Sequence, residues 1–245
     1  MLSSTLIVAL VVFIGAFTQG LAGFGFAFFS LPIISLVLDF QTSVVILVLM
    51  AQVMNLLILK QHGSLPQWGD VLPLTVATLP GIPVGVAMLQ YLPVYVLQGT
   101  LGIILVLYCL YMWFVCPVPR VLGKAWIVVA GFIAGCLGGA LNSQGPPVLM
   151  YVALQPWDKD RVKATTISFF IASGVLVIAA QAWRGLITAD ALELSALCLP
   201  GVLLGATCGR IAYRRLGEGG FRTVFIGLLF ALGLFMLVKS AGDVI

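Results

Sequence analysis

Two uncharged blocks in this chain are too long to cross a membrane once as straight helices. The first, Leu2 to Leu38, has 37 residues, and the second, Ala125 to Trp157, has 33. At a rise of about 1.5 Å per residue they would measure about 55 Å and about 50 Å, whereas the hydrocarbon core of a bilayer is about 30 Å thick. Each block must therefore bend or break.

Composition supports a membrane setting for these blocks. Only 8% of the 245 residues are charged and 62% are hydrophobic, whereas a soluble domain carries about 25% charged residues. The apolar runs lack the period-two alternation of barrel strands. We therefore expect an all-α polytopic protein of the cell inner membrane, in contact with the lipid bilayer, with no partner nucleic acid. Assembly into a homo-oligomer stays open.

The residues that carry enzyme chemistry are scarce. The chain has one histidine, His62, and contains no HExxH, GxSxG, P-loop or CxxC motif. Its five cysteines are scattered through apolar segments. We therefore predict neither an enzyme nor a site for a metal or another cofactor.

The chain repeats itself. The heptapeptide LPGIPVG at Leu79–Gly85 returns as LPGVLLG at Leu199–Gly205, 120 residues later, and the same offset relates Gly25 to Gly145. Colinear landmarks at one offset indicate a duplication, which divides the chain into residues 1–119 and 120–245. Glycines with a four-residue spacing predict close helix packing, and they lie at positions 81, 85, 201, 205 and 209.

Each long block has helix-breaking residues at a matching place: GLAGFGF at Gly20–Phe26 and NSQGPP at Asn142–Pro147. A short helix is expected after each break. Further helices are expected near residues 40–59, 71–89, 93–115, 164–183, 191–209 and 221–238.

The distribution of Lys and Arg indicates whether the short helices turn back. If each block crossed once, the chain would have eight spans, with five cationic residues on one side and seven on the other. If each block crosses and returns, the two sides carry ten and two. Because cytoplasmic loops are rich in Lys and Arg, the second topology is favoured. It is a 5+5 inverted repeat with both termini on the non-cytoplasmic side; eight full spans with kinked first helices are the fallback.

Matching broken helices in inverted repeats are typical of secondary transporters, which bind solute near mid-membrane. The types of residue in the breaks suit an anion, because a helix N-terminus and amide donors hold negative charge without a costly buried cation. We predict that the substrate-binding residues are Asn142, Ser143, Gln144, Gly145 and Pro146, facing Gln19, Gly23, Phe24 and Gly25.

Four more residues are candidates outside the breaks. Gln52 and Asn55 share a helix face and either line the site or hold helices together. Arg161 and Lys163 either set the topology or form a positively charged entrance for anions.

We expect the free backbone donors of the second break to be the amides of 143, 144, 145 and 148. The competing interpretation makes NSQGPP a simple kink whose polar groups cap their own backbone.

The sequence resembles the sulfite exporter TauE/SafE family. The resemblance rests on GLAGFGFAFFSLP in the first half, and on GGALNSQGPPVLMY followed by DRVKATTISFF in the second. It implies a small permease for sulfur-containing anions such as sulfite, sulfonates or thiosulfate. Export is the favoured direction, because an anion leaves a negative interior downhill. The alternatives are a permease for another small anion, such as a carboxylate, thiosulfate import, and a non-transporting membrane sensor subunit.

Overall fold

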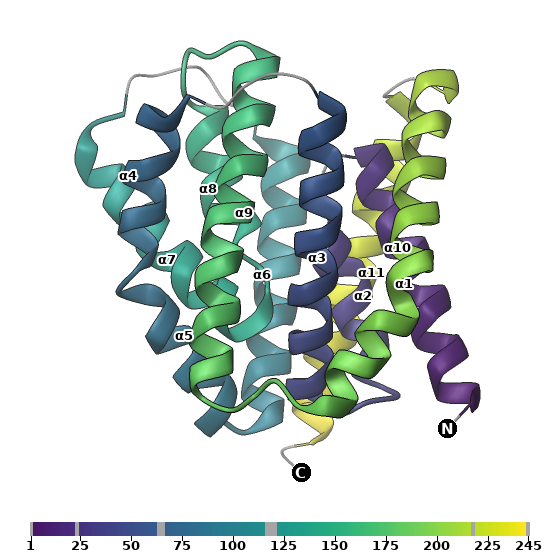
Figure 1. Ribbon diagram of the computed structural model, residues 1–245. Coiled ribbons are helices and arrows are strands. Elements are labelled where there is room, and N and C mark those ends of the chain that lie inside the picture. Colours follow the sequence, from purple (N-terminus) through teal and green to yellow (C-terminus); the bar gives the residue numbers. More distant parts are fainter. Residues whose placement is uncertain (1, 23–24, 63–66, 116–121, 217–218, 244–245) are drawn as a thin grey trace.

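The computed structural model describes residues 2–22, 25–62, 67–115, 122–216 and 219–243. All regular elements within these ranges are helices (Figure 1). They are α1 (Leu2–Ala22), α2 (Phe26–Ile34), α3 (Phe40–His62), α4 (Trp68–Thr78), α5 (Gly81–Tyr91), α6 (Val94–Phe114), α7 (Lys124–Leu141), α8 (Gly145–Ala153), α9 (Lys159–Trp183), α10 (Ala189–Leu216) and α11 (Gly219–Gly242).

Both long blocks break where the sequence predicts. The first block divides into α1 and α2, and the second into α7 and α8. In each case the helix after the break has nine residues. Both pairs pack against each other, α1 on α2 and α7 on α8.

Each pair begins and ends at the same edge of the bundle. In Figure 1 the lower edge holds both chain ends and the start of α3, and the upper edge holds the start of α9. Hydrogen bonds between helix ends agree with this view. Gln41 Nε2 at the start of α3 donates to the Leu89 carbonyl at the end of α5 (3.0 Å), and Arg161 at the start of α9 pairs with Asp70 at the start of α4. The unit α1–α2 therefore turns back to the lower edge, and α7–α8 to the upper edge.

The prediction of a single helix over residues 71–89 is wrong. The chain forms α4 and α5 there, with a bend of 44° between them. Two prolines, Pro80 and Pro83, lie at the break. Each lacks the N–H of a helical hydrogen bond, and its ring crowds the carbonyl four residues earlier. Helix α10, which carries the similar motif LPGVLLG, contains only Pro200 and continues through it.

The start of α9 also lies earlier than expected, at Lys159 instead of near Ala164. Asp158 explains the difference, because its carboxylate accepts a hydrogen bond from the Arg161 N–H (2.7 Å). Such a side-chain cap satisfies a donor that the first turn leaves free. The charged residues after Asp158 therefore belong to α9.

Glycines bring two pairs of helices into backbone contact, as their spacing predicts. A Cβ on Gly85 of α5 would overlap the Cys136 carbonyl group of α7, and a Cβ on Gly205 of α10 would overlap the Phe13 carbonyl oxygen of α1. Gly81 and Gly209 make the same kind of contact. Packing of small residues against backbone is a main source of helix association in membranes.

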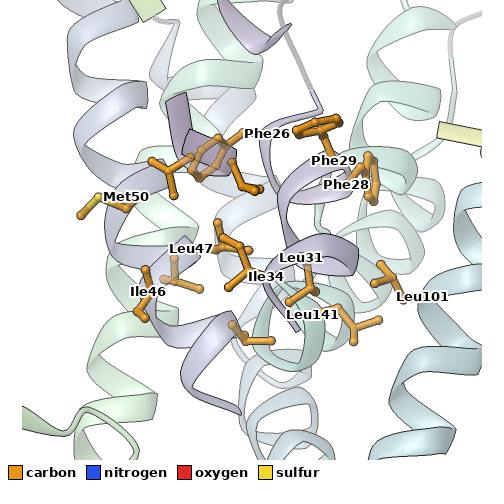
Figure 2. Packing of buried hydrophobic residues seen from close by; sticks show 14 of the residues in the cluster. Phe26, Phe28, Phe29, Leu31, Ile34, Ile46, Leu47, Met50, Leu101 and Leu141 are labelled. Atoms are coloured by element: carbon orange, nitrogen blue, oxygen red, sulfur yellow. The ribbon is translucent and has the colours of Figure 1, made fainter. Parts of the chain in front are cut away.

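Helix α2 is enclosed by other helices. Its apolar side chains Phe26, Phe28 and Leu31 are buried, and they join residues of α3, α6 and α7 in one core cluster (Figure 2). A helix that is apolar on all faces belongs inside a protein or a membrane. This burial fixes the N-terminus of α2 in the interior of the bundle.

Five helices are long and apolar enough to cross a membrane within the described ranges, and the bent pair α4–α5 makes a sixth candidate. The stretches Thr5–Leu21 and Ala125–Leu141 are apolar but shorter. Large apolar side chains cover much of the outer surface, as on Leu10, Leu107 and Val224. This surface suits contact with lipid.

Candidate functional site

The two breaks meet at one partly open cavity of about 50 Å³. It lies close to the midpoints of α3 and α9, which contribute Ala51 and Phe170. The full set of lining residues comes from α1, the first break, α2, α3, the second break, α8 and α9: Gln19, Gly25, Phe26, Ala27, Phe28, Ala51, Asn55, Asn142, Ser143, Gln144, Gly145, Leu149 and Phe170.

Asn142 forms the turn at the second break. It ends α7 in the left-handed conformation with φ of 51°, and its N–H donates to the Gly138 carbonyl (3.1 Å). Asparagine is one of the few residues besides glycine that tolerate this conformation. Its side-chain Nδ2 is buried and has no hydrogen-bond partner among the described residues. A buried amide donor without a partner is costly, so this atom is suited to a bound solute.

The structure corrects the expected set of free donors at the second break. The amide of Ser143 is occupied, because it donates to the Leu137 carbonyl (3.1 Å), and the Ser143 hydroxyl donates to the Leu141 carbonyl (3.0 Å). The first four N–H groups of a helix have no partner within it, but Pro146 and Pro147 have no N–H. Gln144 and Gly145 therefore supply the orphan backbone donors at the start of α8.

The first break presents a second helix N-terminus to the same cavity. Gly25 precedes α2 with φ of 105°, and a Cβ there would lie 2.6 Å from the Phe225 ring, so both backbone and space require glycine. Gln19 Oε1 accepts from the Phe26 N–H (3.1 Å), and Gln19 Nε2 donates to Asn55 Oδ1 (3.4 Å). The amides of Gly25, Ala27 and Phe28 remain without carbonyl partners inside α2.

The electrostatic character of the cavity follows from these two N-termini. Each helix N-terminus carries partial positive charge, equivalent to about half an elementary charge. None of the lining residues has a charged side chain. The site therefore offers donors and dipoles without a fixed charge, and such an arrangement is suited to an anion.

Several residues predicted for the site do not line the cavity. Pro146 is buried in α8 but is not part of the lining. Gln52 Nε2 donates to the Ile171 carbonyl (2.9 Å), and its side chain packs against Gly174, so Gln52 joins α3 to α9. Gly23 and Phe24 lie outside the described residues.

Arg161 and Lys163 lie at the start of α9, away from the cavity. The Arg161 guanidinium makes two hydrogen bonds to the Asp70 carboxylate (2.9 and 3.0 Å) and stacks over the Trp157 ring at 4.7 Å. Its charge is therefore balanced locally. Lys163 is exposed.

Sequence reasoning missed the apolar part of the lining and the support behind it. Phe170, Leu149 and Phe28 look like ordinary apolar residues in the sequence, and nothing local marks them as lining a cavity. Ser173, one turn beyond Phe170, donates to Gln144 Oε1 (2.8 Å).

The described residues contain no group of three or more His, Cys, Asp or Glu side chains that could hold a metal ion.

Comparison of the sequence with known proteins identifies its family. The family model described as sulfite exporter TauE/SafE matches residues 7–236 of the chain. The chain belongs to the sulfite exporter TauE/SafE family. This is a family of membrane transporters, and the chain is a multi-pass membrane protein of this family.

A curated TauE/SafE relative has the name probable sulfite/organosulfonate exporter TauE and comes from Cupriavidus necator. It is 25% identical to this chain over 178 residues, which cover 71% of this chain and 69% of the relative. No solved structure matches the chain.

Proposed function

We propose that this TauE/SafE protein is a secondary transporter that moves a small sulfur-containing anion, sulfite foremost, out of the cell across the inner membrane. The anion binds between the two helix breaks near mid-membrane. The observation that carries the proposal is the cavity at which the N-termini of α2 and α8 converge without a charged side chain.

An inverted repeat of residues 1–119 and 120–245 accounts for the helix arrangement. Helix α1 packs on α10, and its counterpart α7 packs on α4 and α5, which correspond to α10. Helix α3 packs on its counterpart α9, and α6 on α11. A two-fold relation between the halves produces this pairing, and the pairs α1–α2 and α7–α8 turn back at opposite edges.

The size of the cavity favours a compact anion. One water molecule needs about 10–15 Å³ on this measure, so about 50 Å³ holds roughly three to five waters. Sulfite, with one sulfur and three oxygens, is compact enough for a space of this size. The buried Asn142 Nδ2 and the amides of Gln144 and Gly145 are suitable donors to its oxygens.

Orientation and direction follow from charge. Among the described residues, the helix ends at the upper edge carry nine Lys or Arg, and those at the lower edge carry only Arg184 and Lys239. The upper edge is therefore cytoplasmic and both termini are outside. A unit negative charge that leaves a cell with an interior of −100 mV gains about 2.3 kcal/mol, so export needs no coupling ion.

The proposal is tested by sulfite uptake into proteoliposomes at an imposed membrane potential. A potential that is positive inside should drive sulfite inward in the wild type without a pH gradient. Gln144→Leu and Asn142→Ala should lose most of this uptake. Gln181→Leu is the matched control, because Gln181 is fully buried, is not part of the cavity lining and has no partner for either amide atom among the described residues.

Three results would contradict the proposal. Failure of sulfite to move with potential alone would indicate a coupling ion or another solute. A carboxylate or thiosulfate moving in place of sulfite would replace the substrate. Normal uptake by the Gln144 and Asn142 variants would show that the second break only kinks the helix and does not bind the anion.

A further inference from the structure

Gln144 has a side-chain amide whose two ends have different surroundings. Its Oε1 lies 2.8 Å from Ser173 Oγ of α9. Its Nε2 has no hydrogen-bond partner among the described residues, and the residue lines the cavity. Ser173 itself is fully buried and does not line the cavity.

The position of the Gln144 side chain is also fixed from α7. A Cβ added to Gly138 would lie 3.0 Å from Gln144 Oε1 and 3.4 Å from Gln144 Cβ. The space left by this glycine is therefore filled by the Gln144 side chain. Packing on Gly138 and the hydrogen bond from Ser173 hold the amide on two sides.

The direction in which the amide faces decides what the cavity offers. With Oε1 held by a hydroxyl proton, the Nε2 donors face the solute. Reversal of the amide would turn its oxygen, an acceptor, toward an anion, which is repulsive. Ser173 Oγ also lies 2.7 Å from the Phe169 carbonyl, so Gln144 Oε1 and this carbonyl compete for its single proton.

We infer that Ser173 is a positioning residue for anion selectivity: it orients the Gln144 amide so that the two N–H groups, and not the oxygen, face the solute. This inference rests on the proposed function and adds a residue from α9 that the solute does not touch. Ser173→Thr keeps the hydroxyl, whereas Ser173→Ala removes it without adding volume.

The test is the half-saturation concentration for sulfite uptake in proteoliposomes. Ser173→Ala should raise it roughly three- to tenfold, the range of one hydrogen bond, and Ser173→Thr should restore much of the affinity. Ser168→Ala is the control on the same helix, because Ser168 is buried, does not line the cavity and has no hydroxyl partner in the described part of the chain. Its half-saturation concentration should match the wild type.

A double variant separates positioning from general structure. If Ser173 acts through Gln144, Ser173→Ala should cause no further loss in a Gln144→Leu background, because the two residues share one interaction. Equal loss in both backgrounds, or a wild-type half-saturation concentration for Ser173→Ala, would overturn the inference while leaving the proposed function intact. Absence of sulfite transport by the wild type would overturn both.

Discussion

Asn142 combines a backbone requirement with a chemical one. Its φ of 51° terminates α7, and its buried Nδ2 has no partner among the described residues. Most residues pay about 1–2 kcal/mol in the left-handed region, whereas glycine enters it readily. The two roles can therefore be separated by the choice of substitution.

We expect Asn142→Ala to lower the free energy of unfolding by about 1 kcal/mol, and Asn142→Gly to leave it nearly unchanged. Both variants should weaken sulfite transport, because both lose the amide donor. Thermal unfolding in detergent measures the first effect, and proteoliposome uptake measures the second. Wild-type transport by Asn142→Gly would show that the solute does not use this amide.

The sequence shows which polar side chains lie in and near the breaks, but it does not show which groups these side chains hydrogen-bond to. Gln19, Gln52 and Asn55 are all amides in apolar helices. The fold joins Gln19 to Asn55 beside the cavity and directs Gln52 to a carbonyl of α9. Which face of α3 meets which neighbour depends on how the helix is rotated, and no local pattern encodes that rotation.

At the scale of helices, glycine contacts bring α1 against α10 and α5 against α7. Gly205 of α10 lies against the Phe13 carbonyl of α1, and Gly85 of α5 lies against α7. A side chain at either position would force the helices apart.

We expect Gly205→Ala to destabilise the protein by about 1–3 kcal/mol, the usual effect of overpacking. Gly227→Ala is the control, because a Cβ there has no heavy atom within 4 Å among the described residues, apart from its chain neighbours and the backbone of its own helix. It should be neutral or stabilising by up to about 1 kcal/mol, since alanine favours a helix more than glycine does. Unfolding in detergent compares them. Equal stability of the two variants would mean that the α1–α10 contact yields to an added methyl.

The bend between α4 and α5 shows how far the sequence predicts an element. The LPGIPVG and LPGVLLG motifs are similar in sequence, yet the helix breaks only at the first. The second proline of LPGIPVG gives a reason, although the similarity of the motifs suggested a common helix.

The whole molecule places both chain ends at one edge (Figure 1). With the basic edge in the cytoplasm, both ends should be outside. Tags at the N- and C-termini should therefore react with an impermeant reagent on intact spheroplasts. A tag inserted between α6 and α7 should react only after permeabilisation. Tags on opposite sides would exclude the proposed 5+5 topology.

The sequence alone determined the membrane class, the two breaks and the uneven distribution of cationic residues. These features depend on composition, length and residue type, which act locally and are visible along the chain. The tertiary structure decided which donors remain free: it occupied the Ser143 amide, excluded Gln52 from the cavity and placed Ser173 behind Gln144. Those outcomes depend on competition for hydrogen bonds between distant segments, which exists only once the helices are packed.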